Sequence, residues 1–260
     1  AEISVKQIKP GLAVIIVGED PASHVYVKRK HKACQKVGIY SEVIHKDAQV
    51  TQEEIIALIQ SLNGRQDIHG ILVQLPLPKH LDENSILRCV DENKDVDGFH
   101  LINAGRLMRA EPGLHPCTPS GVIRLMKEYD IRMEGAHAVV IGRSNIVGKP
   151  MAHLLLAENA TVTIAHSRTK DLASLCQHAD IIVAAVGIPN MVKSTWVKDG
   201  TCLIDVGINR MPDGTLAGDI DFQEFENRNV SITPVPGGVG PLTIAMLLSN
   251  TLQAYSLQTQ

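Results

Sequence analysis

Short runs of apolar, often β-branched residues alternate with stretches of helical periodicity along the whole chain. The first run, Leu12–Val17, is followed by a turn at Gly18–Pro21 and a predicted helix from about Ser23 to Val37. Gly38 stands where a left-handed residue would end that helix. This alternation is typical of a parallel β-sheet covered by helices, so the sequence predicts an α/β fold.

The next elements continue the pattern. Strands are predicted near Glu42–His45 and at Ile71–Leu75. Between them, Thr51 and Glu54 have the spacing of a capping box and predict the start of a second helix.

The middle of the chain changes character. The segment from Asp91 to Pro119 is rich in turn formers, and we interpret it as a link into a second domain. A helix from about Ser120 to Glu128 would open this domain, and an apolar helix from Thr243 to about Gln253 would close the chain. The predicted elements between these two helices are 137–141, 151–158, 161–165, 171–177, 181–186 and 203–206.

Composition excludes some functional classes. The 260 residues suffice for one large domain or two modest ones. A formal net charge of −3 argues against general nucleic-acid or membrane binding, and no apolar run is long enough to span a bilayer. Five widely spaced cysteines without a CxxC pair, and no signal-peptide pattern at the start, favour reduced thiols in the cytoplasm and no metal site.

A glycine turn follows the predicted strand at His137–Ile141. Gly142 and Gly148 are six residues apart, and a helix starts at the second. Glycines in such a turn let the backbone approach a pyrophosphate, and amides at the helix N-terminus face the anion. The pattern indicates a dinucleotide site, with a plain βα turn as the alternative.

The next strand end suggests which dinucleotide. Ser167 and Arg168 stand where an NAD-specific domain usually has an acid, and together with Arg143 they would bind the 2′-phosphate of NADP. A solvated basic turn is the alternative. Gly187 and Ile208 follow two later strands and are further candidate contacts by position.

A reacting group is predicted on the first helix. Tyr26 and Lys30 are four residues apart and share a face, which Lys28 and Lys32 cannot share. A lysine turned inward beside other cations would have a lowered pKa and could transfer protons near neutrality, while Tyr26 offers a flat surface to a planar ring. The alternative is a solvated or nucleic-acid-binding basic face.

Two polar residues follow in the same half. Gln74 lies late in a predicted strand, where side chains reach the carboxyl edge of a parallel sheet. Asp97 belongs to an Asp-Val-Asp-Gly sequence that could also be a tight turn. Neither residue alone indicates a site.

In combination these segments resemble the methylenetetrahydrofolate dehydrogenase/methenyltetrahydrofolate cyclohydrolase family, in order and over nearly the whole chain. The motifs that carry the resemblance are Val17–Lys30, Gly70–Pro78, Asp95–Gly98, Pro116–Pro119, Gly142–Pro150 and Pro234–Thr243. The family has two α/β domains with a cleft between them. The resemblance implies a catalytic folate-binding domain at 1–117, completed by a C-terminal helix at 242–260, and a Rossmann-like NADP-binding domain at 118–241.

The resemblance also implies residue roles. Lys30 looks like the catalytic lysine, Gln74 the residue that tunes it, and Asp97 the carboxylate that holds the pterin ring. Tyr26 would stack on the aminobenzoyl group. The other implied folate contacts are Pro236, Gly237, Gly238 and Thr243. The implied NADP contacts are Gly142, Arg143, Ser144, Ser167 and Ile208.

The implied activity is oxidation of 5,10-methylenetetrahydrofolate with NADP, then hydrolysis to 10-formyltetrahydrofolate, by a cytoplasmic homodimer of one-carbon metabolism linked to purine biosynthesis. A monofunctional relative, a nucleic-acid-binding module and a non-catalytic NADP sensor are the alternatives. Family members have a strand and a long helix ahead of the strand at Gly11, so the first domain is expected to lack one covering element.

Overall fold

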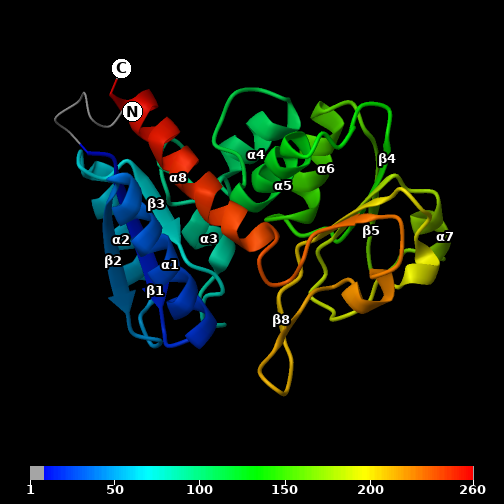
Figure 1. The fold of residues 1–260 in the computed structure, drawn as a ribbon. Coiled ribbons are helices and arrows are strands. Elements are labelled where there is room, and N and C mark those ends of the chain that lie inside the picture. Colours follow the sequence, from blue (N-terminus) through cyan, green and yellow to red (C-terminus); the bar gives the residue numbers. More distant parts are fainter. Residues whose placement is uncertain (1–8, 260) are drawn as a thin grey trace. The chain divides into compact units, whose positions relative to one another are not determined.

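The computed structural model describes residues 9–259 and divides into two compact units (Figure 1). Unit 1 runs to Cys117 and includes the chain from Ile244 onward, whereas unit 2 comprises Thr118–Thr243. Both contain parallel sheets and helices, which confirms the predicted α/β class. The expected missing element ahead of Gly11 concerns positions that lie almost wholly outside the described residues.

Unit 1 is built on a three-stranded parallel sheet of order β2-β1-β3. Its elements are β1 (Gly11–Val17), α1 (Pro21–Val37), β2 (Tyr40–Lys46), α2 (Gln52–Gly64), β3 (Gly70–Val73), α3 (Glu83–Leu87), α4 (Leu101–Met108) and most of α8 (Val239–Gln258). The capping box at Thr51 is formed, and Gly38 ends α1 with a φ of 80°. Both local predictions are confirmed.

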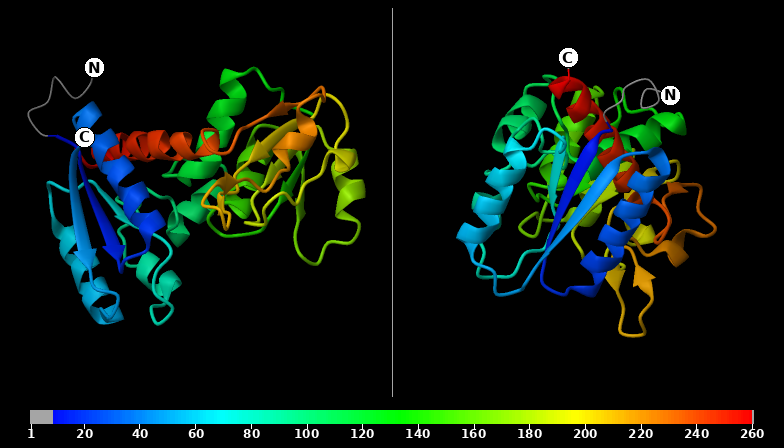
Figure 2. Two further views of the ribbon diagram at one scale, coloured as in Figure 1. Left: turned by 60° about the horizontal axis from the view of Figure 1, so that its bottom comes forward. Right: turned by 90° about the vertical axis from the view of Figure 1, so that its left-hand side faces the viewer.

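Every residue of β1 is buried because helices cover both faces of this sheet. Alternate side chains of a strand point to opposite faces. Ala13, Ile15 and Val17 pack with α2 and α3, whereas Leu12, Val14 and Ile16 pack with α1 and α8. Figure 2, in its right-hand view, shows α2 on one side of the sheet and α1 and α8 on the other. The last helix of the chain thus completes the core of the first unit.

Several boundaries differ from the sequence prediction. α1 begins at Pro21 rather than Ser23, because the Asp20 carboxylate accepts a hydrogen bond from the Ser23 amide and proline suits the first helical turn. β3 ends at Val73, so Gln74 follows the strand instead of lying in it. The region interpreted as an irregular link contains α4, a helix that was not predicted.

His69 joins three elements of unit 1 and gives a pH prediction. It is 3% exposed, its Nδ1 accepts a hydrogen bond from the Gly11 amide, and its ring packs edge-on against Tyr255. Burial, and then the charge of Lys94, lower its pKa below the usual value. Below pH 6.5 the unfolded chain therefore binds more protons than the folded chain, and this part of the stability is lost as pH falls.

We expect His69→Asn, which keeps an acceptor but cannot titrate, to lose less unfolding free energy than the wild-type protein when the pH falls from 7 to 5. Each unit by which the pKa is lowered corresponds to about 1.4 kcal/mol. Urea denaturation of both proteins across this range measures the difference. Parallel curves for the two proteins would show that His69 does not contribute.

Unit 2 has a five-stranded sheet of order β10-β7-β6-β4-β5, parallel at every pairing. Its elements are α5 (Cys117–Glu128), β4 (His137–Ile141), α6 (Gly148–Ala157), β5 (Thr161–Ala165), α7 (Leu172–Gln177), β6 (Ile181–Ala184), η1 (Ser194–Trp196), β7 (Cys202–Asp205), β8 (Asn209–Arg210), β9 (Leu216–Ala217), η2 (Phe222–Phe225) and β10 (Ser231–Ile232). The two faces of β4 again divide the core. Ala138 and Val140 pack with α5 and α6, and Val139 and Ile141 with α7 and η2.

Candidate functional site

Lys30 lies on the buried face of α1, as predicted, with 4% of its surface exposed. Its Nζ donates a hydrogen bond to Gln74 Oε1 over 3.1 Å and lies 4.9 Å from the centre of the Tyr26 ring. Gln74 is held in turn, because its backbone amide donates to the Ile15 carbonyl. Unit 1 therefore brings together three of the residues that the sequence singled out.

The fourth, Asp97, is an opposite charge that acts on Lys30. Burial lowers the pKa of Lys30, and the negative charge of Asp97 partly opposes this. Burial also raises the pKa of Asp97 to about 6, opposed by Lys30. The lowered pKa of Lys30 agrees with the prediction but its cause does not: desolvation acts on Lys30, while Lys28 and Lys32 are exposed.

A framework that sequence reasoning missed holds the Asp97 backbone. Lys94 Nζ donates to the carbonyls of Asn63 and Arg65 at the end of α2. The Asp95 carboxylate accepts from the Phe99 and His100 amides. The segment from Lys94 to Asp97 is thus held by the bonds that Lys94 donates and by the bonds that Asp95 accepts from residues beyond Asp97. The charged residues of Lys-Asp-Val-Asp were the available signal, but the carbonyls that Lys94 binds lie 31 and 29 positions away in the sequence.

Cys117 and Asn250 hold the same segment through the carbonyl of Val96. The Cys117 thiol donates to the Val96 carbonyl, and burial raises the pKa of the thiol. Asn250 of α8 donates to the same carbonyl and to that of His115. Cys117 is 3% exposed and packed, with no geometry that exposes a reactive thiolate.

The predicted glycine turn of unit 2 leaves no room for side chains at its two glycines. Gly142 has a φ of 128°, and a Cβ there would collide with the Ala185 carbonyl oxygen. A Cβ on Gly148 would collide with the carbonyl of Gly142. The helix amides differ from the expectation: Ser144 Oγ accepts from the Val147 and Gly148 amides, so these two are already satisfied.

The basic residues of the predicted phosphate site lie at adjacent strand ends. Ile141 of β4 pairs with Ala165 of β5, so Arg143 and Ser167 each follow two residues after a paired position. Arg143, Ser167 and Arg168 are all exposed. The structure thus gathers the candidate cations and hydroxyl at one edge of the unit 2 sheet.

Gly187 and Ile208 lie beyond the carboxyl ends of β6 and β7. The chain passes from β4 to β5 on one side and then to β6 on the other side of β4, so the direction in which strands are added reverses at β4. Open α/β sheets bind ligands at such a switch point. Ile188 and Ile208 are 52% and 59% exposed there. Apolar side chains at this edge suit the flat face of a cofactor ring.

The candidate folate residues of the last loop belong to unit 2, not to the unit that holds Lys30. Thr243 Oγ1 lies 2.9 Å from Thr118 Oγ1, Gly237 has a φ of 106°, and the Gly238 amide donates to the Pro234 carbonyl. These contacts order the loop within its own unit. The grouping of Pro236, Gly237, Gly238 and Thr243 with Lys30 stays a prediction.

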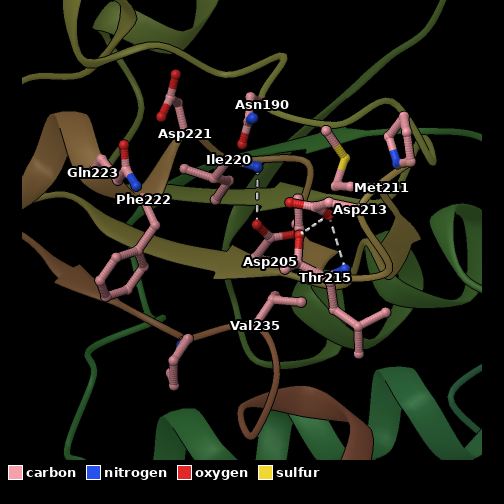
Figure 3. A pocket seen from close by; sticks show the side chains of 15 residues that line it. Asn190, Asp205, Met211, Asp213, Thr215, Ile220, Asp221, Phe222, Gln223 and Val235 are labelled. Carbon is pink, nitrogen blue, oxygen red and sulfur yellow. Dashed lines mark hydrogen bonds between the residues drawn. The ribbon is translucent and has the colours of Figure 1, made fainter.

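A separate cavity of about 590 Å³ lies in unit 2 beside Asp205 (Figure 3). It is lined by the β8–β9 hairpin and by residues around η2, and includes none of the predicted site residues. Residues 9–259 contain no group of three or more His, Cys, Asp or Glu placed to hold a metal ion. Over the same range, no helix is long and apolar enough to cross a membrane.

Two profiles of one protein family match this chain, one in each half. The sequence profile of the tetrahydrofolate dehydrogenase/cyclohydrolase catalytic domain matches residues 1–97, and that of the NAD(P)-binding domain matches residues 116–259. Bifunctional protein FolD of Campylobacter concisus (strain 13826) is 57% identical over 247 residues, 95% of this chain and 87% of that protein.

Solved structures are similarly close. The bifunctional enzyme FolD-methylenetetrahydrofolate dehydrogenase/cyclohydrolase from Campylobacter jejuni has a TM-score of 0.96 and 51% identity, covering 98% of this chain and 91% of that one. The Trypanosoma brucei methylenetetrahydrofolate dehydrogenase-cyclohydrolase, complexed with NADP cofactor and inhibitor, has a TM-score of 0.94 and 38% identity, covering 100% and 91%. The chain therefore belongs to the tetrahydrofolate dehydrogenase/cyclohydrolase family.

Proposed function

We propose that this protein oxidises 5,10-methylenetetrahydrofolate to 5,10-methenyltetrahydrofolate with NADP and then hydrolyses the product to 10-formyltetrahydrofolate. The observation that carries the proposal is the buried Lys30 held by Gln74 and faced by Asp97. A family member with only one activity would have no need of a desolvated lysine in addition to a nucleotide turn. We also propose that the folate-binding domain comprises residues 1–117 and 242–260, and that the NADP-binding domain comprises residues 118–241.

The residues of unit 1 would serve the second step. Water adds to the electrophilic methenyl carbon, and the C–N bond to N5 breaks as the formyl group stays on N10, with net release of one proton. Neutral Lys30 Nζ can accept a proton from the attacking water, and burial, which lowers the pKa of Lys30, favours that neutral form. Gln74 Oε1 fixes the position of Nζ, Tyr26 offers its ring to the aminobenzoyl group, and Asp97 would hold the pterin.

The residues of unit 2 would hold NADP, which when bound supplies the hydride acceptor. Gly142 and Ser144 would line the pyrophosphate, Arg143 and Ser167 the 2′-phosphate, and Ile208 the nicotinamide. Exposed cations at the ends of β4 and β5 fit a dianionic phosphate better than a neutral ribose hydroxyl. A relative's solved structure with NADP supports this choice.

The direct test is to mix the purified protein with 5,10-methylenetetrahydrofolate and follow reduced cofactor, with NADP and NAD in parallel. NADPH formation with little NADH, followed by loss of the methenyl absorbance, is expected. A folded protein that turns over neither cofactor would refute the dehydrogenase assignment. Persistence of the methenyl absorbance would refute the cyclohydrolase assignment alone.

Arg143→Gln gives a sharper test of cofactor choice. Removing one charge-assisted contact to a phosphate costs about 1.5–3 kcal/mol, so kcat/KM for NADP should fall roughly 10- to 100-fold while the value for NAD hardly changes. Arg124→Gln is the matched control, because Arg124 is an exposed arginine of the same unit that pairs only with Glu128 among the described ion pairs. Equal losses with NADP and NAD would contradict the assigned role.

The protein is further proposed to act as a cytoplasmic homodimer in one-carbon metabolism linked to purine biosynthesis. Five free cysteines, four of them buried, support a reducing compartment. The family resemblance supports the dimer. Sedimentation analysis at micromolar concentration distinguishes a dimer from a monomer.

A further inference from the structure

Two buried carboxylates of unit 2 have no part in the proposed chemistry. Asp205 ends β7 and is 3% exposed, and Asp219 follows the β8–β9 hairpin and is fully buried. A buried carboxylate is costly unless hydrogen bonds compensate for its lost hydration. The groups that donate to these two side chains therefore show what each one holds in place.

Asp219 holds the loop that follows β6. Its Oδ2 accepts from the amides of Val186 and Gly187 at 2.6 and 3.0 Å, and its Oδ1 accepts from the Ile188 amide at 3.0 Å. Asn209 Nδ2 donates to the same Oδ1 at 3.0 Å. One carboxylate thus fixes three consecutive backbone amides and ties them to β8.

Asp205 fixes Asp219 in turn. Its Oδ1 accepts from the Asp219 amide at 2.9 Å, and its Oδ2 accepts from the Ile220 amide at 2.8 Å, the bond drawn in Figure 3. Glycines make room for both carboxylates, because a Cβ on Gly207 would collide with Asp219 and a Cβ on Gly218 would collide with Asp205. The two acids and two glycines form one interlocked unit.

The loop held by Asp219 lies at the switch point of the sheet. Ala185, which precedes it, contacts Gly142 of the glycine turn closely enough to exclude a side chain there. Ile188, on the held loop, and Ile208, beyond β7, present apolar side chains at the same edge. A displaced loop would therefore move the surface on which the cofactor is expected to lie.

We propose that Asp219 is a positioning residue for hydride transfer, because it holds Val186–Ile188 as the surface against which the nicotinamide half of NADP lies. The inference rests on the proposed function. Hydride transfer requires close alignment, and a misplacement of about 1 Å can cost roughly 100-fold in rate. The hydrolytic residues Lys30 and Gln74 belong to unit 1, whereas all members of this network belong to unit 2.

Asp219→Asn is the informative variant, since its amide offers one accepting oxygen in place of two and turns N–H groups toward backbone donors. We expect dehydrogenase kcat to fall at least about 10-fold with a raised KM for NADP, and the primary deuterium isotope effect to rise. Cyclohydrolase activity, assayed on methenyltetrahydrofolate without NADP, should stay within about twofold. Asp180→Asn is the control, because Asp180 accepts from the His137 amide at the opposite, amino end of the sheet.

Unchanged dehydrogenase kinetics in folded Asp219→Asn, or equal loss of both activities, would overturn the inference. If that variant does not fold, Asn209→Ala decides, because it removes one donor from a short surface hairpin. A severalfold rise in KM for NADP with unchanged cyclohydrolase activity is expected, and no change would overturn the inference. A wild-type protein without dehydrogenase activity would instead refute the proposed function.

Discussion

Lys30→Met should reduce cyclohydrolase activity by about 100-fold or more, because positioned proton transfer contributes about 10²–10⁴-fold and Met cannot provide it. Met fills a similar volume, so the variant should stay folded, but its melting temperature should fall because Gln74 Oε1 loses its donor and Asp97 loses an opposite charge. Dehydrogenase activity should fall much less, since hydride transfer needs no proton from Nζ. Loss of methenyl absorbance and NADPH formation, measured separately, give the two rates.

Lys28→Met is the matched control, because Lys28 lies on the same helix with its side chain exposed. Both activities of this variant should remain within about twofold of wild type. Full cyclohydrolase activity in a folded Lys30→Met protein would rule out Lys30 as the group that moves the proton. Parallel loss of both activities would point to folate binding instead.

Gly142→Ala should have the second large effect and the opposite selectivity. The residue has a φ of 128°, and its new Cβ would meet the Ala185 carbonyl oxygen. Backbone strain of this kind costs roughly 1–3 kcal/mol, so KM for NADP should rise about 5- to 150-fold. Cyclohydrolase activity without NADP should persist, because Lys30 and Gln74 are in the other unit.

Gly200→Ala separates strain from contact in this experiment. Gly200 also has a positive φ, 83°, but a Cβ there has nothing within 4 Å. We expect a small loss of stability and an unchanged KM for NADP. A similar rise in KM for both variants would show that the damage spreads through the fold instead of acting at the glycine turn.

Local signals in the sequence were sufficient for much of the fold. The capping box at Thr51 and the left-handed glycine at Gly38 depend on neighbouring residues alone, so both were predictable. α4 was missed because Leu101, Ile102 and Met108 are exposed, which blurs the helical periodicity that burial normally produces. The strands of the β8–β9 hairpin have two residues each, too few for a detectable alternation.

The contacts within the candidate site also differ in whether local sequence predicts them. Tyr26 and Lys30 share a helix face, so their proximity follows from spacing alone. The contact of Lys30 with Gln74 spans 44 positions, and that of Asp219 with Val186 spans 33. Neither contact follows from local pattern, because both depend on strand order and loop path. Residue roles at the folate and NADP sites stay predictions until the variants above are measured.

The discontinuous make-up of unit 1 has a consequence for how the molecule is synthesised. Asn250 closes the hydrogen bonds around Val96 and His115, and Leu247 and Ala254 fill the core beside β1. Every residue of unit 2 leaves the ribosome before these do. Because domains generally fold as units during translation, unit 2 can be complete while the apolar face of β1 still awaits α8. During that interval the nascent chain exposes this apolar face, which is prone to aggregation, and chaperones would have to act on its N-terminal half.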